Sequence, residues 1–539
     1  MFKNNGKRQT LLCGTRKKLH STAQHYAERN TNEPYNISTM KKVATFLFVL
    51  LACSIATCQP ISLGDDSELK IGSLQGERII VRTGTDMIDT VVVMYNYDIN
   101  ISDGENRFTI RHLNTNYTVS FKIPDVYTSG ETPFPQPPNY SGGKHLFRIN
   151  DMRILDGICY FCGVHSITTG NFFYDTNGHM TYETNNEGYV GKFSIHDVLY
   201  NINPSFEYTT IPKVWALNRM AVYSFGQGFV SISMLGIPKG ALDTAPTCIV
   251  DLYQNPTEWR QVIKYSTNSS EILTDIMYSN NRITTVSRII YDNYSFILRH
   301  ASTPHILSSP TCLDKAYIYS TLPATPVNYP DLTVTYRYET DPIFLCPSND
   351  NNFFVAHSSS NMNYGTAVYR MKHINDCIAP TNLENQYTFS LYYTELKDIA
   401  FSPSKKTFYS LVEKNPGYST SIQMSTFPMS ADYTDFMFSL TGKHHQSFDV
   451  LNAPRLVVGG RLLSDNGIFQ SNFKLFHYSY PFVFPTMTCI QPSTIPVFIL
   501  NRIEEVGLGK ELKEFVNDKI SWDTKNVSVE SLTTATICP

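Results

Sequence analysis

Short runs of alternating apolar and polar residues, separated by tight turns, fill most of the chain between residues 68 and 500. In residues 272–301 the runs IMYS, RITTVSRII and SFILRH are separated by Asn280-Asn281 and Asp292-Asn293. Alternating runs bounded by turn residues are typical of antiparallel strands joined in sequence order. The pattern therefore predicts a β-meander here.

The same arrangement returns along the chain at nearly regular spacing. About four strands per unit, at a period of about 60 residues, is typical of a β-propeller. Residues 68–150 contain enough predicted strands for one more unit. We therefore expect an all-β protein with a seven-bladed β-propeller over residues 68–500, with six blades as the alternative. The predicted units start near Asp156, Arg219, Asp275, Ile343, Asp398 and Leu456.

The pattern changes after residue 500. The stretch RIEEVGLGKELKEFVNDKI (502–520) places Leu508, Leu512 and Phe515 at helical spacing. We therefore predict a short C-terminal helix, followed by a strand that closes the ring, within residues 501–539.

Composition agrees with a β-rich fold and limits the function. The chain has 34 Tyr and 32 Phe, and only 17% of its residues are charged; aromatic residues are favoured in strands. The first 42 residues carry nine Lys or Arg and two Glu, which leaves 35 basic and 45 acidic residues in the remainder. An acidic body repels phosphate backbones, so nucleic-acid binding is not expected.

The segment MKKVATFLFVLLACSIATCQP, which starts at Met40, has the parts of an export signal: two Lys, an apolar run and a small-residue region. The apolar run is too short to span a bilayer comfortably. Leu50-Leu51-Ala52-Cys53 resembles a bacterial lipobox in which Cys53 would be acylated, although Leu51 departs from the usual small residue. The alternative is an ordinary cut before Gln59.

These features divide the chain into five parts. Residues 1–39 are interpreted as a disordered basic extension upstream of the true start, residues 40–58 as the signal and residues 59–67 as a linker. The propeller over 68–500 and the C-terminal part over 501–539 follow.

Motifs for metal or cofactor chemistry are weak. Cys159 and Cys162 have the spacing of a redox or zinc pair, but they lie in a predicted strand, where residues three apart point to opposite faces. The stretch Asp175–Gly178 starts like a calcium loop without its further ligands, and His444-His445 stands alone. We expect no metal and no cofactor. Export permits disulfides among the cysteines that follow the signal, but their pairing cannot be derived from the sequence.

An aliphatic residue, any residue and then Asp precede three of the predicted strands, at Asp156, Asp275 and Asp398. Asp commonly binds the backbone of its own turn, so a turn cap is the favoured interpretation. In a propeller, these residues would lie at related positions of different blades and would form an acidic ring at one face. They are therefore the weak catalytic candidates.

The segments MKKVATFLFVLLACS, NDMRILDGICYFCG, ILTDIMYSNNRITTVSR and LKDIAFSPSKKTFYSLVE resemble uncharacterised exported β-propeller proteins of Bacteroides-type gut bacteria. The resemblance covers about residues 40–480, and its motifs are structural. It implies a propeller fold and an envelope location, in the periplasm, on the outer-membrane surface or secreted. It implies no activity.

The expected function is non-catalytic recognition or scaffolding in the bacterial cell envelope, because propellers bind ligands at one face of their central channel. The expected partners are a glycan, a peptide or an envelope protein, bound by a monomer that touches the membrane only through its signal or lipid anchor. The alternative is a carbohydrate-active hydrolase or lyase, which needs two free carboxyl groups at a defined separation.

Overall fold

All described residues belong to one compact unit, residues 64–539. Strands predominate among its described residues, whose helix is α3 (Ile195–Leu199), which begins after the capping residue Ser194. The all-β prediction is confirmed. No helix within the described residues is long and apolar enough to cross a membrane. The computed structural model describes residues 68–538 with gaps at 72–77, 99–104, 114, 116, 124–145, 175–179, 226–228, 240–245, 255–257, 280–281, 291, 302–315, 322–342, 349–351, 359–365, 373–385, 390–393, 403–406, 415–418, 427–433, 444, 451–454, 464–468, 478–489, 500–502, 511 and 533.

The predicted extension, export signal and linker, including Cys53, lie outside the described residues. The start of the calcium-like loop at Asp175 and the first residue of the His444-His445 pair also lie outside them.

Five antiparallel sheets have five strands each. The first is β2 (Arg78–Thr85), β3 (Thr90–Asp98), β4 (Glu105–His112), β5 (Thr118–Lys122) and β33 (Val529–Ser531). The second is β6 (Leu146–Leu155), β7 (Ile158–Tyr174), β8 (Met180–Ser194), β9 (Ser205–Ile211) and β32 (Asp523–Asn526). The third is β10 (Val214–Phe225), β11 (Phe229–Pro238), β12 (Cys248–Gln254), β13 (Trp259–Ser266) and β31 (Leu512–Ile520). The fourth is β14 (Glu271–Ser279), β15 (Arg282–Ile289), β16 (Asp292–Ala301), β17 (Ala316–Thr321) and β30 (Ile503–Leu508). The fifth is β26 (His445–Val450), β27 (Arg455–Leu463), β28 (Phe469–His477), β1 (Glu68–Ile71) and β34 (Thr534–Cys538).

A nine-stranded sheet consists of two groups of four strands that share one outer strand, β29 (Ile490–Ile499). One group is β18 (Ile343–Pro347), β19 (Asn352–Ser358), β20 (Thr366–Lys372) and β21 (Gln386–Phe389). The other is β22 (Thr394–Ser402), β23 (Thr407–Lys414), β24 (Ser419–Thr426) and β25 (Thr434–Lys443).

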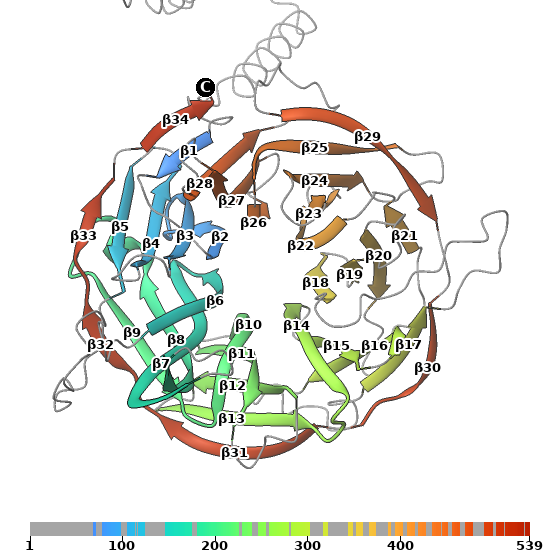
Figure 1. The fold of residues 1–539 in the computed structure, drawn as a ribbon, viewed down its shortest axis with the longest axis horizontal. Helices are drawn as coiled ribbons and strands as arrows, with labels where there is room; N and C mark the ends of the chain where they lie inside the picture. Colours follow the sequence, from blue (N-terminus) through green and yellow to red (C-terminus); the bar gives the residue numbers. More distant parts are fainter. Residues whose placement is uncertain are drawn as a thin grey trace, which may run out of the picture. The chain divides into compact units, whose positions relative to one another are not determined.

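The first strands of these seven groups are β2, β6, β10, β14, β18, β22 and β26. Each contacts the first strand of the next group along the chain, and β26 contacts β2. The first strands therefore follow one another in a closed cycle, and Figure 1 shows them around a common centre. Four predicted unit starts, Arg219, Asp275, Ile343 and Asp398, fall in first strands, whereas Asp156 directly follows β6 and Leu456 lies in the second strand β27.

The C-terminal residues 490–538, which we call the belt, supply the outermost strand of every group. The belt strand β29 joins β21 and β25, and the next five belt strands pair with β17, β13, β9, β5 and β1 in that order. From β29 to β33 the belt therefore meets the first six groups in the reverse of their chain order, and β34 then meets the seventh group, which starts with β26. Figure 1 shows its strands, coloured orange-red to red, outside the others.

The predicted helix over 502–520 is wrong, because β30 and β31 occupy that stretch. The residues of β31 pair antiparallel with β13 from Leu512↔Ser266 to Ile520↔Trp259. Helical spacing is a weak prior that tertiary partners override, and the open edge of β13 offers a row of backbone partners.

The hydrophobic core lies between neighbouring groups. Phe108 of β4, for example, packs at 5.0 Å between ring centroids against both Phe161 of β7 and Phe193 of β8. Four further buried clusters each contain residues of two consecutive groups. Each sheet therefore buries its faces against the sheets before and after it, because no single meander could bury enough apolar surface alone.

Candidate functional site

The first strands carry a repeated irregularity. In four of them the strand pairing shifts by one residue immediately before Asp151, Arg219, Asp275 or Asp398, which is the signature of a β-bulge. Hydrogen bonds between neighbouring first strands align the other three groups with these positions. We call the aligned residues the ring position: Arg82, Asp151, Arg219, Asp275, Phe344, Asp398 and Asp449.

Two aspartates at the ring position join neighbouring strands. Asp151 accepts hydrogen bonds from its own neighbour Met152 N (2.9 Å) and from Met220 N of the next group (3.1 Å). Asp275 accepts from Ile276 N (2.9 Å) and from Leu345 N of the next group (2.7 Å). In each case the donor in the next group follows a ring position that is not Asp.

The other two aspartates are engaged in related ways. Asp398 accepts from Ile399 N at 3.0 Å. Asp449 accepts from Thr83 at both its backbone N (2.8 Å) and its Oγ1 (3.0 Å), and so joins β26 to β2 where the cycle closes. Backbone N–H groups on first strands are thus satisfied by carboxylates of the preceding group.

Arg82 connects three groups across the centre. Its guanidinium lies 3.1 Å from Asp151 and 3.4 Å from Asp398, and it also donates to Met152 O and Val81 O. Burial alone would lower its pKa, but the carboxylates of Asp398, Asp151 and Asp449 outweigh burial and raise it. Arg82 therefore stays charged, and its role is to hold the aspartates in place.

Two carboxyl groups at the ring position have opposite pKa shifts. Burial would raise the pKa of Asp151, but Arg153, Arg82, Arg219 and the Met220 N–H together lower it below its usual 3.8. For Asp275, burial outweighs the favourable effect of Arg219, and its pKa is raised. The difference follows from the partners, because Asp151 has two arginines within salt-bridge distance and no such ion pair is found for Asp275 among the described residues.

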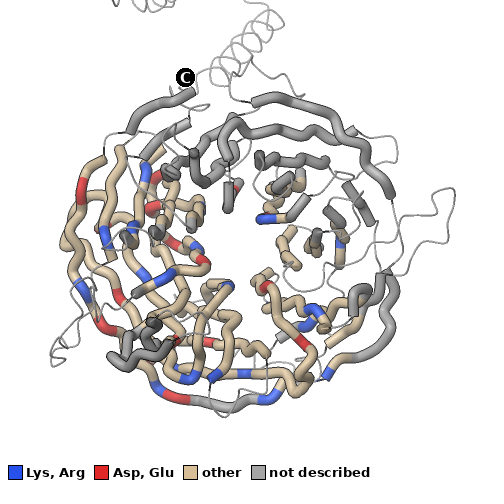
Figure 2. Tube along the Cα trace, viewed as in Figure 1, with Lys and Arg blue, Asp and Glu red and all other residues tan. Residues whose placement is uncertain are grey.

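The first strands line a cavity of about 330 Å3. This volume is at the low end of the range for ligand pockets, about 300–1,000 Å3. Figure 2 shows acidic and basic residues together on the strands around it. The charged residues that line it are Arg82, Arg153, Arg219, Asp275, Asp398 and Asp449.

The arginines of the cavity differ in their engagement. Arg153 donates to Asp151 Oδ1 at 3.0 Å, and its side chain is 32% exposed. Arg219 is half-buried, and its Cζ lies 5.1 Å from the centroid of the Phe344 ring. Within the described residues the side chain of Arg219 forms no hydrogen bond or ion pair. Its fork of N–H donors is therefore available in the cavity.

The three sequence candidates do not form one set. Asp275 and Asp398 occupy equivalent ring positions, and both line the cavity. Asp156 lies elsewhere, exposed in the turn between β6 and β7, where its φ is +48°. The residue equivalent to the other two is Asp151, which the same sequence pattern, Ile149-Asn150-Asp151, could have identified.

Four further ring-position residues were not singled out as a site in the sequence: Arg82, Arg219, Phe344 and Asp449. They lack the aliphatic-x-Asp pattern, so only spatial alignment identifies them. The favoured turn-cap interpretation is wrong for Asp275 and Asp398, because both lie inside first strands, at a β-bulge and not in a turn. Each still accepts a hydrogen bond from the backbone N of the residue that follows it.

The structural interpretation of Cys159 and Cys162 agrees with the fold. Both are buried residues of β7 that form no disulfide, and they belong to different core clusters, one on each side of the strand. Burial raises the pKa of the Cys159 thiol, which opposes formation of the reactive thiolate. Among the described residues, no group of three or more His, Cys, Asp or Glu side chains is placed to hold a metal.

No protein-family model matches the chain, and no curated protein matches it. Among solved structures, the polysaccharide lyase Uly1 is similar to it, with a TM-score of 0.33 and 8% sequence identity. The match covers 77% of this chain and 98% of that chain. A TM-score this low carries no functional conclusion, so the function is argued from the site.

Proposed function

We propose that this chain is an exported seven-bladed β-propeller that recognises a ligand in the bacterial cell envelope and catalyses no reaction. The closed cycle of seven first strands supports the propeller. Each blade would consist of the four strands of one group, with the belt strand at its outer edge. The cavity at the centre of the cycle is where propellers of this kind bind ligands.

The observation that carries the non-catalytic part is the engagement of the carboxylates. Both oxygens of Asp275 accept backbone N–H bonds, and Asp398 is held by Ile399 N and Arg82. A glycoside hydrolase needs one carboxyl to give a proton to its substrate and a second to act as base or nucleophile. Carboxylates that instead bridge neighbouring strands serve the fold.

The raised pKa of Asp275 favours a second candidate function. A buried acid whose pKa is raised is better suited to donate a proton, and groups with shifted pKa values gather at active sites. In a carbohydrate-active hydrolase or lyase, Asp275 would be the proton donor. Its two backbone partners count against this role, because a proton on either oxygen would face an N–H donor.

A panel of oligosaccharides and envelope polysaccharides separates the two functions. The purified protein is incubated with each, and both binding and the release of new reducing ends or unsaturated products are measured. Binding without product supports recognition. Product formation that Asp275→Asn abolishes, while Asp156→Asn leaves it unchanged, establishes the enzyme.

The proposed export to the cell envelope rests on the signal-like segment at residues 40–58. Intact mass spectrometry of the protein from a bacterial host tests it. A diacylglycerol adduct on Cys53 indicates an anchored lipoprotein, and a chain that starts at Gln59 indicates a soluble exported protein. An uncleaved chain contradicts bacterial export.

A further inference from the structure

The cavity contains one cationic group that the fold itself does not use. Arg82 is tied to Asp151 and Asp398, and Arg153 is tied to Asp151. The Arg219 side chain contacts the face of Phe344, at 5.1 Å, and forms no hydrogen bond or ion pair among the described residues. A cation–π contact uses none of the N–H donors in a hydrogen bond to an oxygen acceptor, so these donors remain available to a ligand.

Two neighbouring carboxylates attract the charge of Arg219 but do not accept hydrogen bonds from its guanidinium. Asp151 and Asp275 are close enough to affect it electrostatically. The carboxylate oxygens of both, however, accept the backbone N–H bonds of Met220 and Leu345. A half-buried guanidinium that has lost part of its water shell and gains no hydrogen bond in return is costly, unless a ligand completes it.

A planar carboxylate is the group that matches this fork. Guanidinium and carboxylate form two parallel charge-assisted hydrogen bonds, which makes Arg better suited to this group than Lys. The cavity of about 330 Å3 accommodates a small molecule or one terminal unit of a larger one.

We propose that Arg219 binds the carboxylate of a small ligand, or of a terminal unit, inside the central cavity. The inference rests on the proposed recognition function and names its ligand class. Arg219 contacts the ligand, Phe344 holds the guanidinium plane, and Arg82 with the ring-position aspartates keeps the strands in register around it.

Two pairs of matched probes test the proposal: glucuronate against glucose, and benzoate against benzamide. Binding to the full exported chain is measured by calorimetry and by saturation-transfer NMR at neutral pH. We expect at least one carboxylate to bind, and its neutral counterpart to bind at least tenfold more weakly.

Variants then assign the binding to the residue. Arg219→Gln is expected to weaken carboxylate binding at least tenfold, and Arg219→Lys, which keeps the charge and loses the fork, to weaken it to an intermediate degree. Arg148→Gln is the matched control, because Arg148 is exposed on β6 and does not line the cavity. The thermal midpoints of all three variants report whether they fold.

Absence of carboxylate binding at millimolar concentration overturns the inference, as do equal affinities within both probe pairs or wild-type affinity in both Arg219 variants. Should a neutral glycan bind while the carboxylates do not, the recognition function stands and this inference alone fails. Turnover of a bound probe would instead contradict the proposed non-catalytic function.

Discussion

A single carboxylate at the ring position accepts a backbone N–H bond that, within a sheet, a carbonyl of the neighbouring strand would accept. First strands of adjacent groups are in contact but are not paired by a hydrogen-bond ladder. Asp151 and Asp275 each span that gap by accepting one N–H from their own strand and one from the next. Each such Asp therefore fixes the register between two sheets.

Asp275→Ala is expected to destabilise the protein by about 2–4 kcal/mol, because it leaves the buried N–H groups of Ile276 and Leu345 without an acceptor, at about 1–3 kcal/mol each. Chemical denaturation followed by fluorescence measures the change. Asp156→Asn is the control and is expected to stay within about 0.5 kcal/mol, because an exposed Asn tolerates the left-handed backbone. Equal losses in both variants would contradict the bridging role.

Asp151 and Asp275 are expected to affect stability with opposite dependence on pH. The lowered pKa of Asp151 means that its contribution is present above pH 3.8 and is lost as pH falls below that value. The raised pKa of Asp275 means that its ionisation costs stability as pH rises from 3.8 through its folded pKa.

The measurement is the free energy of unfolding between pH 3 and pH 8 for the wild type, Asp151→Asn and Asp275→Asn. On acidification, the advantage of the wild type should shrink relative to Asp151→Asn and grow relative to Asp275→Asn. Parallel curves for the two variants would exclude the assigned shifts.

The sequence revealed the recurring Asp and could not fix its alignment. Two aliphatic-x-Asp patterns, ending at Asp151 and Asp156, lie five residues apart, and only the β-bulge before Asp151 distinguishes them. The next group and Arg82 both bind these carboxylates through long-range contacts. The residues in contact are separated by 69 positions in one case and by 316 positions in the other. Local pattern contains no information about such contacts.

At the scale of elements, the meanders and a closing C-terminal strand were predictable, and the rest of the belt was not. A meander reads as a strand, a turn and a strand, so residues 271–301 could be interpreted locally. The stretch Leu512–Ile520 has a strand partner about 250 residues earlier in the chain, and its own spacing favoured a helix. Its structure is set by the edge it covers.

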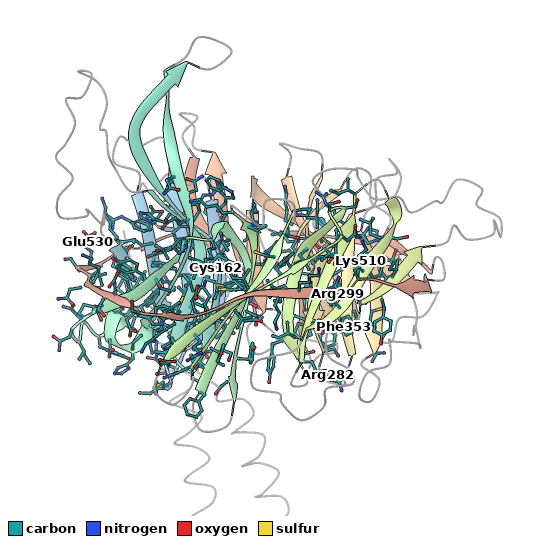
Figure 3. The ribbon with its side chains drawn as sticks, turned by 90° about the horizontal axis from the view of Figure 1, so that it is seen from below. Cys162, Arg282, Arg299, Phe353, Lys510 and Glu530 are labelled. Carbon is teal, nitrogen blue, oxygen red and sulfur yellow. The ribbon has the colours of Figure 1, made fainter. Side chains whose placement is uncertain are left out.

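Two hydrogen bonds hold the link between β30 and β31 in place, and close packing surrounds Gly509. The Arg299 guanidinium, which is fully buried and paired with Glu271, donates to Lys510 O, and both labelled residues appear in Figure 3. Gly509 N donates to Ala316 O at 2.9 Å. A Cβ on Gly509 would lie 2.7 Å from Ala316 Cβ, which is too close for van der Waals contact.

Gly509→Ala is therefore expected to destabilise the protein by about 1–3 kcal/mol, the usual cost of overpacking. Hydrogen exchange should also speed up in β30 and β31 more than in β32. Lys510→Ala is the control, because the Lys510 side chain is exposed and only its backbone carbonyl is used. Unchanged exchange in Gly509→Ala would show that this link does not position the belt.

At the scale of the whole molecule, the belt covers edges. Five groups take their fifth strand from residues after 500, and an uncovered edge strand is a template for pairing with another chain. The first and last described strands meet in one sheet, where β34 pairs with β1.

A chain that ends at residue 500 is expected to keep most of its far-ultraviolet β signal and to form oligomers or aggregates. Light scattering coupled to size-exclusion chromatography measures the mass, with a chain that ends at residue 532 as the control, because it loses β34 alone. A truncated chain that stays monomeric would show that the belt is dispensable for edge protection.

The reversed course of the belt also determines when each sheet can be finished during synthesis. A ribosome makes β2 to β5 first, yet their outer strand β33 begins only at Val529. The group that starts with β22 is made much later and receives β29 soon afterwards. The oldest sheets thus have an open edge for longest, and a premature stop near residue 500 would leave unfinished sheets around the molecule and not one defective sheet.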